Sequence, residues 1–382
     1  MNMLKCQKHL FQLDKDIHYL NCAYKAPLLK SAENTLINSL EKERNPYHYK
    51  PNDFFESTEI ARVLFADMIN AKSNQIALFP STSYGFATVL HNVKANHKKA
   101  ITIENEFPSG YFAVEKWSKE HQASLITVKK GDRTAKLWNE AILDSIDRKT
   151  DVVLISMNHW MDGTKIDIKS IGDKCHQLGV TFIVDATQLA GAFPINVVNL
   201  KVDALICACY KWLFGPYSTA IGYFSPKFSD GIPIEESWMN RTNAMEFSKI
   251  TDYDSTYKPD SSRYNVGQTS NFLLTPILIE GLKQIQKWGV QQIHNYCFSL
   301  FSEIKNGLSS IGVGFEENDY IYPHLFSLKL PNGVNPEAMK TTLEKNKIYV
   351  SLRGSYIRVS LNVFNNKNDI DALKNCIQKK LR

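Results

Sequence analysis

The chain has 382 residues, of which 43% are hydrophobic and 22% charged, a composition typical of a soluble globular protein. Its 45 basic and 39 acidic residues give a formal net charge of +6 and are scattered, without the dense basic block expected of a nucleic-acid-binding protein. No window approaches the ~18 consecutive apolar residues of a membrane span, and segment 1–9 is too polar for a signal peptide. We therefore expect neither nucleic acid nor membrane as a partner, and about two domains.

The 7 cysteines are odd in number and contain no Cys-x-x-Cys pair. This pattern is typical of free thiols in a reducing compartment, so we expect a cytoplasmic protein without a disulfide framework. No histidine or further cysteine pair completes a zinc site beside Cys207 and Cys209, so no metal ion is expected.

Short apolar runs alternate with amphipathic stretches between about residues 75 and 226. The predicted strands are 75–79, 100–103, 124–128, 152–157, 181–184, 204–208 and 219–224. Their runs are continuous, as in strands that are covered on both faces. Helical patterns lie between them, for example 168–178, which Gly179 closes. The sequence therefore predicts an α/β fold in which a mainly parallel seven-stranded sheet lies between helices.

The segments around this core predict a second, smaller α+β domain. A helix that starts near Ser57 precedes the core, and an irregular stretch, 227–271, follows it. Two helical patterns come next, and the chain then alternates again; the predicted helices are 276–288, 290–311, 336–346 and one from 369, and the strands are 325–330, 348–352 and 356–361. We expect a large domain at 17–265 and a small domain formed by 1–16 and 266–382.

Two neighbouring predicted strands end close to residues of opposite charge. The run 181–184 ends at Asp185, and the run 204–208 is followed closely by Lys211. Parallel strands deliver such residues to one edge of the sheet, where ligands of open α/β sheets bind. A lysine that forms a Schiff base and an aspartate that keeps a pyridine nitrogen protonated are what a pyridoxal phosphate enzyme needs. Taken singly, each has a structural alternative, a helix-capping aspartate and a surface lysine.

The motifs Asp-Ala-Thr-Gln at 185–188 and Tyr-Lys-Trp-Leu-Phe-Gly-Pro at 210–216 resemble those of the class V aminotransferase family. This family includes cysteine desulfurases, kynureninase and isopenicillin N epimerase-like enzymes. The resemblance implies a fold-type I enzyme dependent on pyridoxal 5'-phosphate, with Lys211 bound to the cofactor and Asp185 at its ring nitrogen. It also implies that Gln188 contacts the phenolate oxygen and that Tyr210 reaches the phosphate.

Two further turns follow predicted strands. The hydroxyl-rich turn 80–85 opens an apolar helix, whose free N–H groups and dipole favour a phosphate. The resemblance points to Thr82 and Ser83 as phosphate contacts; a plain helix N-cap is the alternative. Phe107 is similar to the aromatic residue that stacks on the pyridine ring in kynureninase-like members, with a core phenylalanine as the alternative.

The resemblance makes two less certain assignments by position. Matching back from Gly163 places Trp160 where desulfurases hold the phenolate oxygen with an asparagine, and either His159 or Trp160 could face the pocket. Gln268 and Thr269 share the position through which one subunit contacts the cofactor phosphate of the other. This implies a homodimer with active sites at the interface.

Arg353 and Arg358 belong to a pattern similar to the family's Arg-x-Gly … Arg-x-Ser … Asn signature. Arg358 lies in an apolar strand, where an unpaired guanidinium is costly, so we expect a bidentate carboxylate partner. The resemblance implies that both arginines bind substrate and that Arg358 holds its α-carboxylate; a structural ion pair is the alternative. The connection 354–357 lacks the nucleophilic cysteine of desulfurases, which argues against persulfide chemistry.

These features imply an enzyme that acts on an amino acid through an external aldimine and an α-carbanion. Transamination is our first expectation, C–S or C–C lyase chemistry the second and epimerisation the third. A non-catalytic protein that binds an amino acid or the cofactor is the alternative from another class. The presence of both Lys211 and Asp185 disfavours it.

Overall fold

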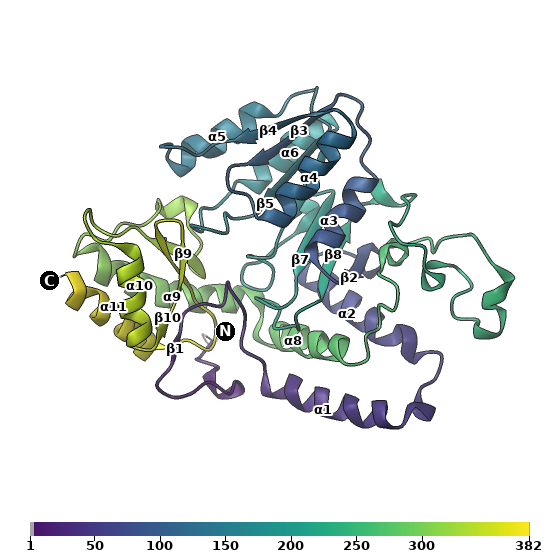
Figure 1. Ribbon diagram of the computed structural model, residues 1–382, viewed down its shortest axis with the longest axis horizontal. Coiled ribbons are helices and arrows are strands. Elements are labelled where there is room, and N and C mark those ends of the chain that lie inside the picture. The colour runs from purple at the N-terminus through teal and green to yellow at the C-terminus, as the bar shows by residue number, and fades with distance from the viewer. Residues whose placement is uncertain (1–3, 382) are drawn as a thin grey trace.

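A seven-stranded sheet forms the centre of the larger part of the computed structural model, which describes residues 4–381 (Figure 1). Residues 1–3 of the polar segment 1–9 and residue 382 lie outside that range. The sheet order is β2-β8-β7-β6-β5-β3-β4, and β8 runs antiparallel to β2 and β7 while the other paired neighbours run parallel. The strands are β2 (Ile76–Phe79), β3 (Lys99–Ile103), β4 (Ser124–Val128), β5 (Val152–Ser156), β6 (Thr181–Asp185), β7 (Ala204–Ala208) and β8 (Ala220–Phe224). The predicted mainly parallel sheet is confirmed.

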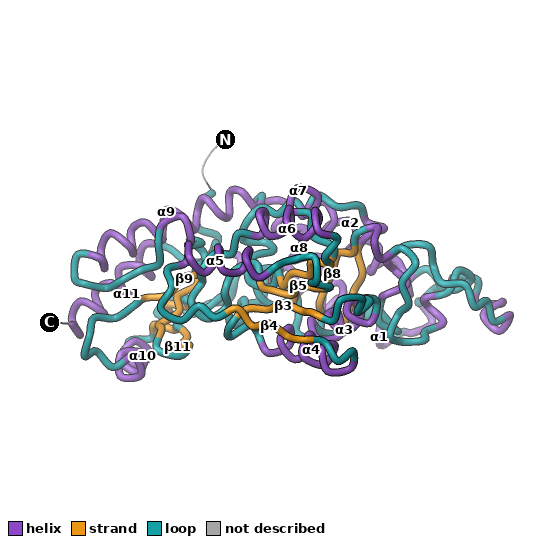
Figure 2. The backbone as a smooth tube through the Cα atoms, turned by 90° about the horizontal axis from the view of Figure 1, so that it is seen from above, coloured by secondary structure: helices purple, strands orange, loops and turns teal. Residues whose placement is uncertain are grey.

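Helices cover both faces of this sheet, and the strands appear as a middle layer in Figure 2. Alternate side chains of β5 pack into different clusters: Val153 and Ile155 join one hydrophobic cluster, and Val152 and Leu154 join the other. The first cluster includes residues of α2 (Asp53–Ile69), α5 (Ala135–Ser145), α6 (Ile168–Leu178), α7 (Val197–Leu200) and α8 (Leu274–Trp288), and the second those of α3 (Thr82–His91) and α4 (Pro108–Glu120). This double coverage explains the continuously apolar sequences of the other strands. The edge strand β4 is the exception: its side chains alternate between exposed and half-buried positions before Val128, so the expected coverage on both faces is wrong for 124–128.

The smaller part of the molecule is built on a three-stranded antiparallel sheet with the order β11-β12-β9. Its strands are β9 (Leu325–Leu328), β11 (Ser351–Arg353) and β12 (Tyr356–Ser360), and its helices are α9 (Val290–Ser309), α10 (Pro336–Lys345) and α11 (Lys367–Leu381). β1 (His18–Tyr19) pairs in parallel with β10 (Ile348–Tyr349), so the two ends of the chain meet here (Figure 1). The predicted strand 348–352 is therefore two strands, β10 and β11, which pair with different partners.

One helix was not predicted from the sequence. α1 (Lys30–Arg44) packs against α8 along the lower edge of the molecule in Figure 1. Ala32, Leu36, Ile37 and Leu40 recur at helical spacing in this segment, so the apolar pattern that could have predicted the helix is present in its sequence. The predicted irregular stretch 227–271 is confirmed: it forms loops and short 3₁₀ helices that project from the large part. No helix within residues 4–381 is long and apolar enough to cross a membrane.

Candidate active site

Two adjoining cavities lie at the carboxyl ends of the central strands. The first has a volume of about 290 Å³ and the second about 300 Å³. The residues that line both are Phe107, Trp160, Gln188, Tyr210, Lys211 and Tyr217. Thr82, Ser83 and Asp185 line only the first cavity, and Arg353 and Arg358 only the second. The fold therefore brings together all the predicted site residues except Gln268 and Thr269.

Lys211 follows β7 and points into both cavities with 6% of its surface exposed. Its Nζ atom lies 5.5 Å from the ring centre of Phe107 and 5.4 Å from that of Tyr210. Within residues 4–381 no carboxylate comes within ion-pair distance of this amine. Burial lowers the pKa of Lys211 to about 8. The amine is consequently uncharged, and nucleophilic, much more often near neutral pH than an exposed lysine is.

Asp185 is the last residue of β6 and is also buried. Its Oδ1 atom accepts a hydrogen bond of 2.8 Å from the backbone N–H of Thr187, and burial raises its pKa. No lysine, arginine or histidine of the described chain lies within ion-pair distance of it. A buried carboxylate without a cation is costly. Its position on the cavity wall suits a ligand that brings a positive charge.

The turn before α3 is both a helix cap and part of the cavity wall. The Oγ atom of Ser81 accepts a hydrogen bond of 3.2 Å from the backbone N–H of Tyr84, so the predicted N-cap exists. Thr82 and Ser83, in the first turn, line the cavity. A Cβ on Gly85 would lie 2.9 Å from a side-chain carbon of Ile206, so glycine lets the helix approach the sheet closely. The helix N-terminus thereby reaches a position where its dipole favours an anion.

Trp160, and not His159, faces the cavity. The indole N–H of Trp160 donates a 2.7 Å hydrogen bond to the carbonyl of Asn105, and its ring meets that of Phe107 edge-on at 5.5 Å. His159 instead pairs with Asp162 at 2.9 Å and lines neither cavity. The structure thus decides the alternative that the sequence left open.

Gln188 lines the cavities, and its amide already has partners. Its Nε2 atom donates to the carbonyl of Ala23 at 3.1 Å, and its Oε1 atom accepts from the indole N–H of Trp212 at 2.9 Å. These bonds hold the side chain in one orientation. The second hydrogen of Nε2 is left for a ligand atom.

Sequence reasoning missed Asn158, which lines the first cavity directly after β5. The residue is 1% exposed, and neither its Nδ2 nor its Oδ1 atom has a hydrogen-bond partner within the described range. Buried polar groups without partners are rare in folded proteins. A polar residue directly after the strand, at the edge where ligands bind, is the signal that could have identified it.

A second missed residue is Glu106, which lies beneath the cavity. Its carboxyl group accepts hydrogen bonds of 2.6 Å from the backbone N–H groups of Ser156 and Phe107, and one from the Ser156 hydroxyl. Burial raises the pKa of Glu106 to about 7, with a contribution from nearby Asp185. These bonds connect β5 to the segment that carries Phe107.

Arg358 lies on β12 and is 1% exposed. Its Nη1 atom donates to the carbonyl of Trp160 at 2.7 Å, while its Nε atom is buried without a partner. Burial, together with nearby Arg353, lowers its pKa to about 9. No carboxylate of the described chain pairs with it. The alternative of a structural ion pair is therefore wrong for the described chain.

Gln268 and Thr269 lie away from both cavities in the single chain. Gln268 is exposed and has a φ of 59°, whereas Thr269 is buried and its hydroxyl oxygen has no partner within residues 4–381. Their predicted contact with the cofactor of a second subunit stays a prediction.

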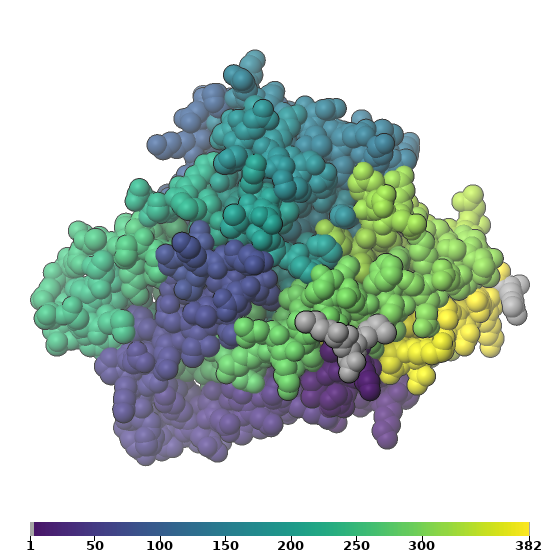
Figure 3. Space-filling view, turned by 180° about the vertical axis from the view of Figure 1, so that it is seen from behind, coloured from purple at the N-terminus to yellow at the C-terminus, as the bar shows by residue number. Residues whose placement is uncertain are grey.

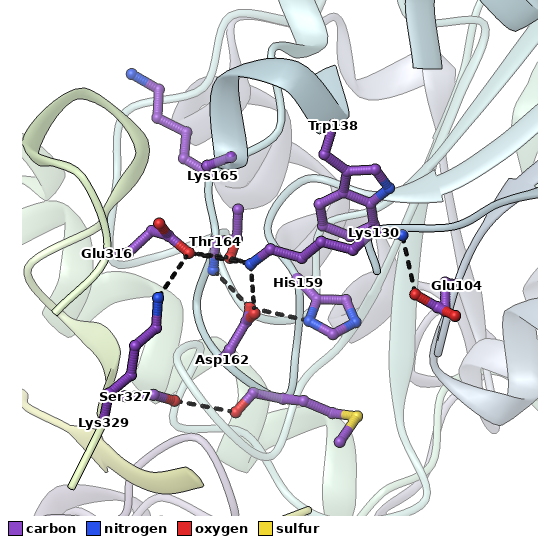
Figure 4. Close-up of polar contacts among 12 residues, drawn as sticks. Glu104, Lys130, Trp138, His159, Asp162, Thr164, Lys165, Glu316, Ser327 and Lys329 are labelled. Carbon is purple, nitrogen blue, oxygen red and sulfur yellow. Dashed lines mark hydrogen bonds and ion pairs between the residues drawn. The ribbon is translucent and has the colours of Figure 1, made fainter. Parts of the chain in front are cut away.

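A polar network around Asp162 connects the two parts of the molecule (Figure 4). The Nζ atom of Lys130, after β4, lies 2.8 Å from a carboxylate oxygen of Asp162 and 3.0 Å from one of Glu316. It also donates a 2.8 Å hydrogen bond to the hydroxyl of Thr164. Asp162 belongs to the loop that carries Trp160, and Glu316 precedes β9 of the small part. The network therefore holds that loop against both parts.

The residues of the first cavity fit pyridoxal phosphate. Lys211 offers an amine for its aldehyde, and Asp185 a carboxylate for its ring nitrogen. The unpaired amide of Asn158 suits its ring oxygen, and the N-terminus of α3 suits its phosphate. Within the described chain, each of these four groups lacks a partner of the required kind. One bound molecule of the cofactor would supply a partner to all four.

Comparison with known proteins agrees with this fit. The sequence profile described as aminotransferase class-V matches residues 26–373. The uncharacterised aminotransferase YcbU of Bacillus subtilis is 24% identical over 320 residues, covering 82% of this chain and 81% of that protein. A probable cysteine desulfurase of Pyrococcus abyssi is 22% identical and covers 84% of this chain and 82% of its own length.

Among solved structures, a mutant of C-DES with glycine covalently linked to its pyridoxal phosphate cofactor has a similar fold. The TM-score is 0.85 at 16% identity, and the match covers 97% of this chain and 98% of that one. The long profile match, together with the cavity residues, shows that the chain belongs to the class-V aminotransferase family of pyridoxal phosphate-dependent enzymes.

Proposed function

We propose that this chain is an aminotransferase that acts on amino acids. The observation that carries the proposal is the pairing of two buried cationic groups without acidic partners, Lys211 and Arg358, on the wall of one cavity. Lys211 is placed to take a proton from the α-carbon of a bound ligand, and Arg358 to hold a carboxylate. An α-amino acid carries both groups.

Arg358 binds the α-carboxylate of the substrate. Its Nη1 atom is fixed by the Trp160 carbonyl, its Nη2 atom donates a long hydrogen bond of 3.5 Å to the Ser351 hydroxyl, and its Nε atom has no partner within the described chain. A guanidinium edge with two parallel N–H groups matches a carboxylate in geometry as well as charge. The substrate's α-carbon is thereby held on the Lys211 side of the cavity.

Lys211 moves the proton. Pyridoxal phosphate, when bound, supplies an aldehyde that captures amines and a ring that accepts the electron pair left by a departing proton. The amine of Lys211, with its pKa lowered to about 8, takes the proton from the α-carbon and can return it at another atom. Asp185 stabilises positive charge at the far side of the cavity, and Phe107 with Trp160 limits the access of water.

Further assignments belong to the same proposal. Thr82, Ser83 and Tyr210 would contact the phosphate, and Gln188 with Asn158 the ring oxygen. Gln268 and Thr269 would reach the phosphate of a second subunit in a homodimer. The expected division into 17–265 and 1–16 with 266–382 is kept as a large and a small domain with shifted boundaries, because α8 packs on α1 and α2 and β1 pairs with β10. We also retain a cytoplasmic location, for which the seven unpaired cysteines are the support.

The test is chemical labelling followed by an assay. Borohydride treatment of the purified, pyridoxal phosphate-loaded protein should fix the cofactor mass on the peptide that contains Lys211, and Lys211→Arg should abolish labelling. Amino acids offered together with 2-oxoglutarate or pyruvate should yield the corresponding new amino acid. A label on another lysine, or no amino transfer with any pair, would contradict the proposal.

Lyase chemistry on a sulfur amino acid is the second candidate, because one of the relatives is a probable cysteine desulfurase. Neither cavity is lined by a cysteine. Cys22 lies nearby, but burial raises the pKa of its thiol to about 12, so it is no thiolate. The chain therefore offers no persulfide carrier at the site. Release of sulfide and pyruvate from cysteine would favour this candidate over transamination.

A further inference from the structure

The second cavity is lined by basic residues and by no acidic one. Its charged lining residues are Lys25, Lys211, Arg353 and Arg358, and the others are neutral. Asp185 lines only the first cavity, on the side assigned to the cofactor ring. A cleft lined by one sign of charge concentrates ligands of the opposite sign. The proposed function assigns Arg358 to the α-carboxylate of the substrate. The positive charge of the other basic residues in this cavity has no such assignment.

Arg353 is a second guanidinium in this cavity without an assigned partner. It lies at the end of β11, and its guanidinium lies 5.7 Å from the ring centre of Trp160. Its Nη1 atom donates to the carbonyl of Leu352 at 2.8 Å, and its Nε atom is buried without a partner in the part of the chain that the structure describes. No carboxylate there pairs with it. Its Nη2 atom makes no hydrogen bond there either, and because the residue lines the second cavity, this side of the guanidinium is left for a ligand.

Trp160 holds the two arginines in a fixed relation. Its carbonyl accepts from Arg358, and its ring lies beneath Arg353. The strands β11 and β12 pair directly, with Ser351 opposite Arg358 and Arg353 opposite Tyr356. Two guanidinium groups held close together repel each other, and each gains from an anion. One carboxylate satisfies Arg358, so the arrangement suits a ligand with two.

We propose that the substrate is an amino acid whose side chain ends in a carboxylate, of the aspartate and glutamate class. Arg358 holds its α-carboxylate, and the free edge of Arg353 holds the side-chain carboxylate. This inference rests on the proposed function, since it deepens the description of the same site. It also predicts that lysine and arginine are poor substrates, because a cationic side chain would enter a cavity whose charged lining residues are all positive.

The first experiment uses ligands that cannot react. Calorimetry on the pyridoxal phosphate-loaded protein should show that succinate, with two carboxylates, binds about 10- to 100-fold more tightly than butyrate, which has one. Arg353→Gln should remove this preference and leave butyrate affinity unchanged. Arg358→Gln should weaken both ligands. Arg148→Gln, at an exposed arginine remote from the lining residues, is the matched control and should change neither affinity.

The second experiment compares isosteric amino acids. Aspartate should change the cofactor absorbance at a concentration about 10-fold lower than asparagine, and Arg353→Gln should abolish the difference. Arg353→Lys, which keeps the charge but not the bidentate edge, should lose only part of it and serves if the glutamine variant does not fold.

Equal binding of succinate and butyrate, or a preference that survives both Arg353 substitutions, would overturn the inference. If succinate binds through Arg353 but no amino acid alters the cofactor spectrum, the proposed transamination is wrong while the dicarboxylate site is supported. The two failures are therefore distinguishable.

Discussion

Buried charged and polar groups without partners identify the site at the scale of single residues. Lys211, Asp185, Asn158 and Arg358 are each buried. Within residues 4–381 the amide of Asn158 and the Nε atom of Arg358 have no hydrogen-bond partner, and Lys211 and Asp185 have no partner of opposite charge within ion-pair distance. Such groups destabilise the free protein unless something compensates, so they are informative when several face one cavity. Two testable consequences follow from their burial.

The first concerns the lowered pKa of Lys211. Only the uncharged amine attacks an aldehyde, so the rate of loading apo-protein with pyridoxal phosphate should rise with pH and level off above about 8. An exposed lysine, with a value of 10.5, would continue to gain rate beyond pH 9. Stopped-flow absorbance between pH 6 and 10 measures this profile. A profile that still rises steeply at pH 9.5 would contradict the assigned burial effect.

The second concerns Asp185. Asp185→Asn keeps the shape but removes the charge, so the positive form of a ring nitrogen is no longer stabilised. We expect the variant to retain cofactor but to exchange the substrate α-proton with solvent deuterium more slowly, by a factor on the order of 100. NMR follows the exchange. Exchange at the original rate would make this carboxylate a structural residue.

At the scale of secondary-structure elements, the loop between β5 and α6 determines where several of the cavity residues lie. It carries Asn158 and Trp160 on the cavity side and Asp162 on the opposite side, where Lys130 and Glu316 bind it (Figure 4). Gly163 has a φ of 78°, and a Cβ there would lie 2.4 Å from the carbonyl oxygen of Leu325. The loop therefore packs directly on β9, and the position of the small part determines that of Trp160.

Removal of Lys130 should test this dependence. Lys130→Met leaves Asp162 and Glu316 buried with fewer positive partners, so we expect unfolding to become easier by about 3 kcal/mol. Succinate affinity should also fall, because Trp160 positions both arginines. Chemical denaturation and calorimetry measure the two effects. Lys129→Met, at the exposed neighbouring lysine, is the control; equal effects in both variants would show that the network has no special role.

At the scale of the whole molecule, the first two long helices both carry exposed apolar side chains. Ile37 and Leu40 of α1 are 52% and 39% exposed, and Ile60 and Val63 of α2 are 38% and 46% exposed. The purple and blue segments that contain these helices lie together in Figure 3. Apolar residues gathered in this way favour association, which agrees with the homodimer expected from the segment 267–271.

Sedimentation of the loaded protein should therefore give about twice the chain mass of 43.6 kDa. Gln268→Ala, in the exposed turn, should weaken cofactor retention if this residue reaches the phosphate of the other subunit. The dimer mass should persist in that variant. A monomer that is fully active at assay concentration would rule out a shared site.

The sequence by itself determined the sheet, the family and many of the residues that line the two cavities. Strands that are buried on both faces must be continuously apolar, and parallel strands carry their ligand residues at one edge, so Asp185 and Lys211 could be placed from chain position alone. Interactions between segments that are distant in the sequence could not be predicted in this way, because they produce no pattern in the local sequence. Asn158, for example, is unusual only because no group within residues 4–381 pairs with its amide.

Only the tertiary structure decided which of His159 and Trp160 faces the cavity, and that Arg358 has no acidic partner within the described residues. It also decided that no acidic residue lies beside the two arginines. Each of these depends on side chains from different parts of the fold that meet across a cavity. The residues next to these side chains in the sequence do not specify such contacts, because the packing between the two parts of the molecule determines them.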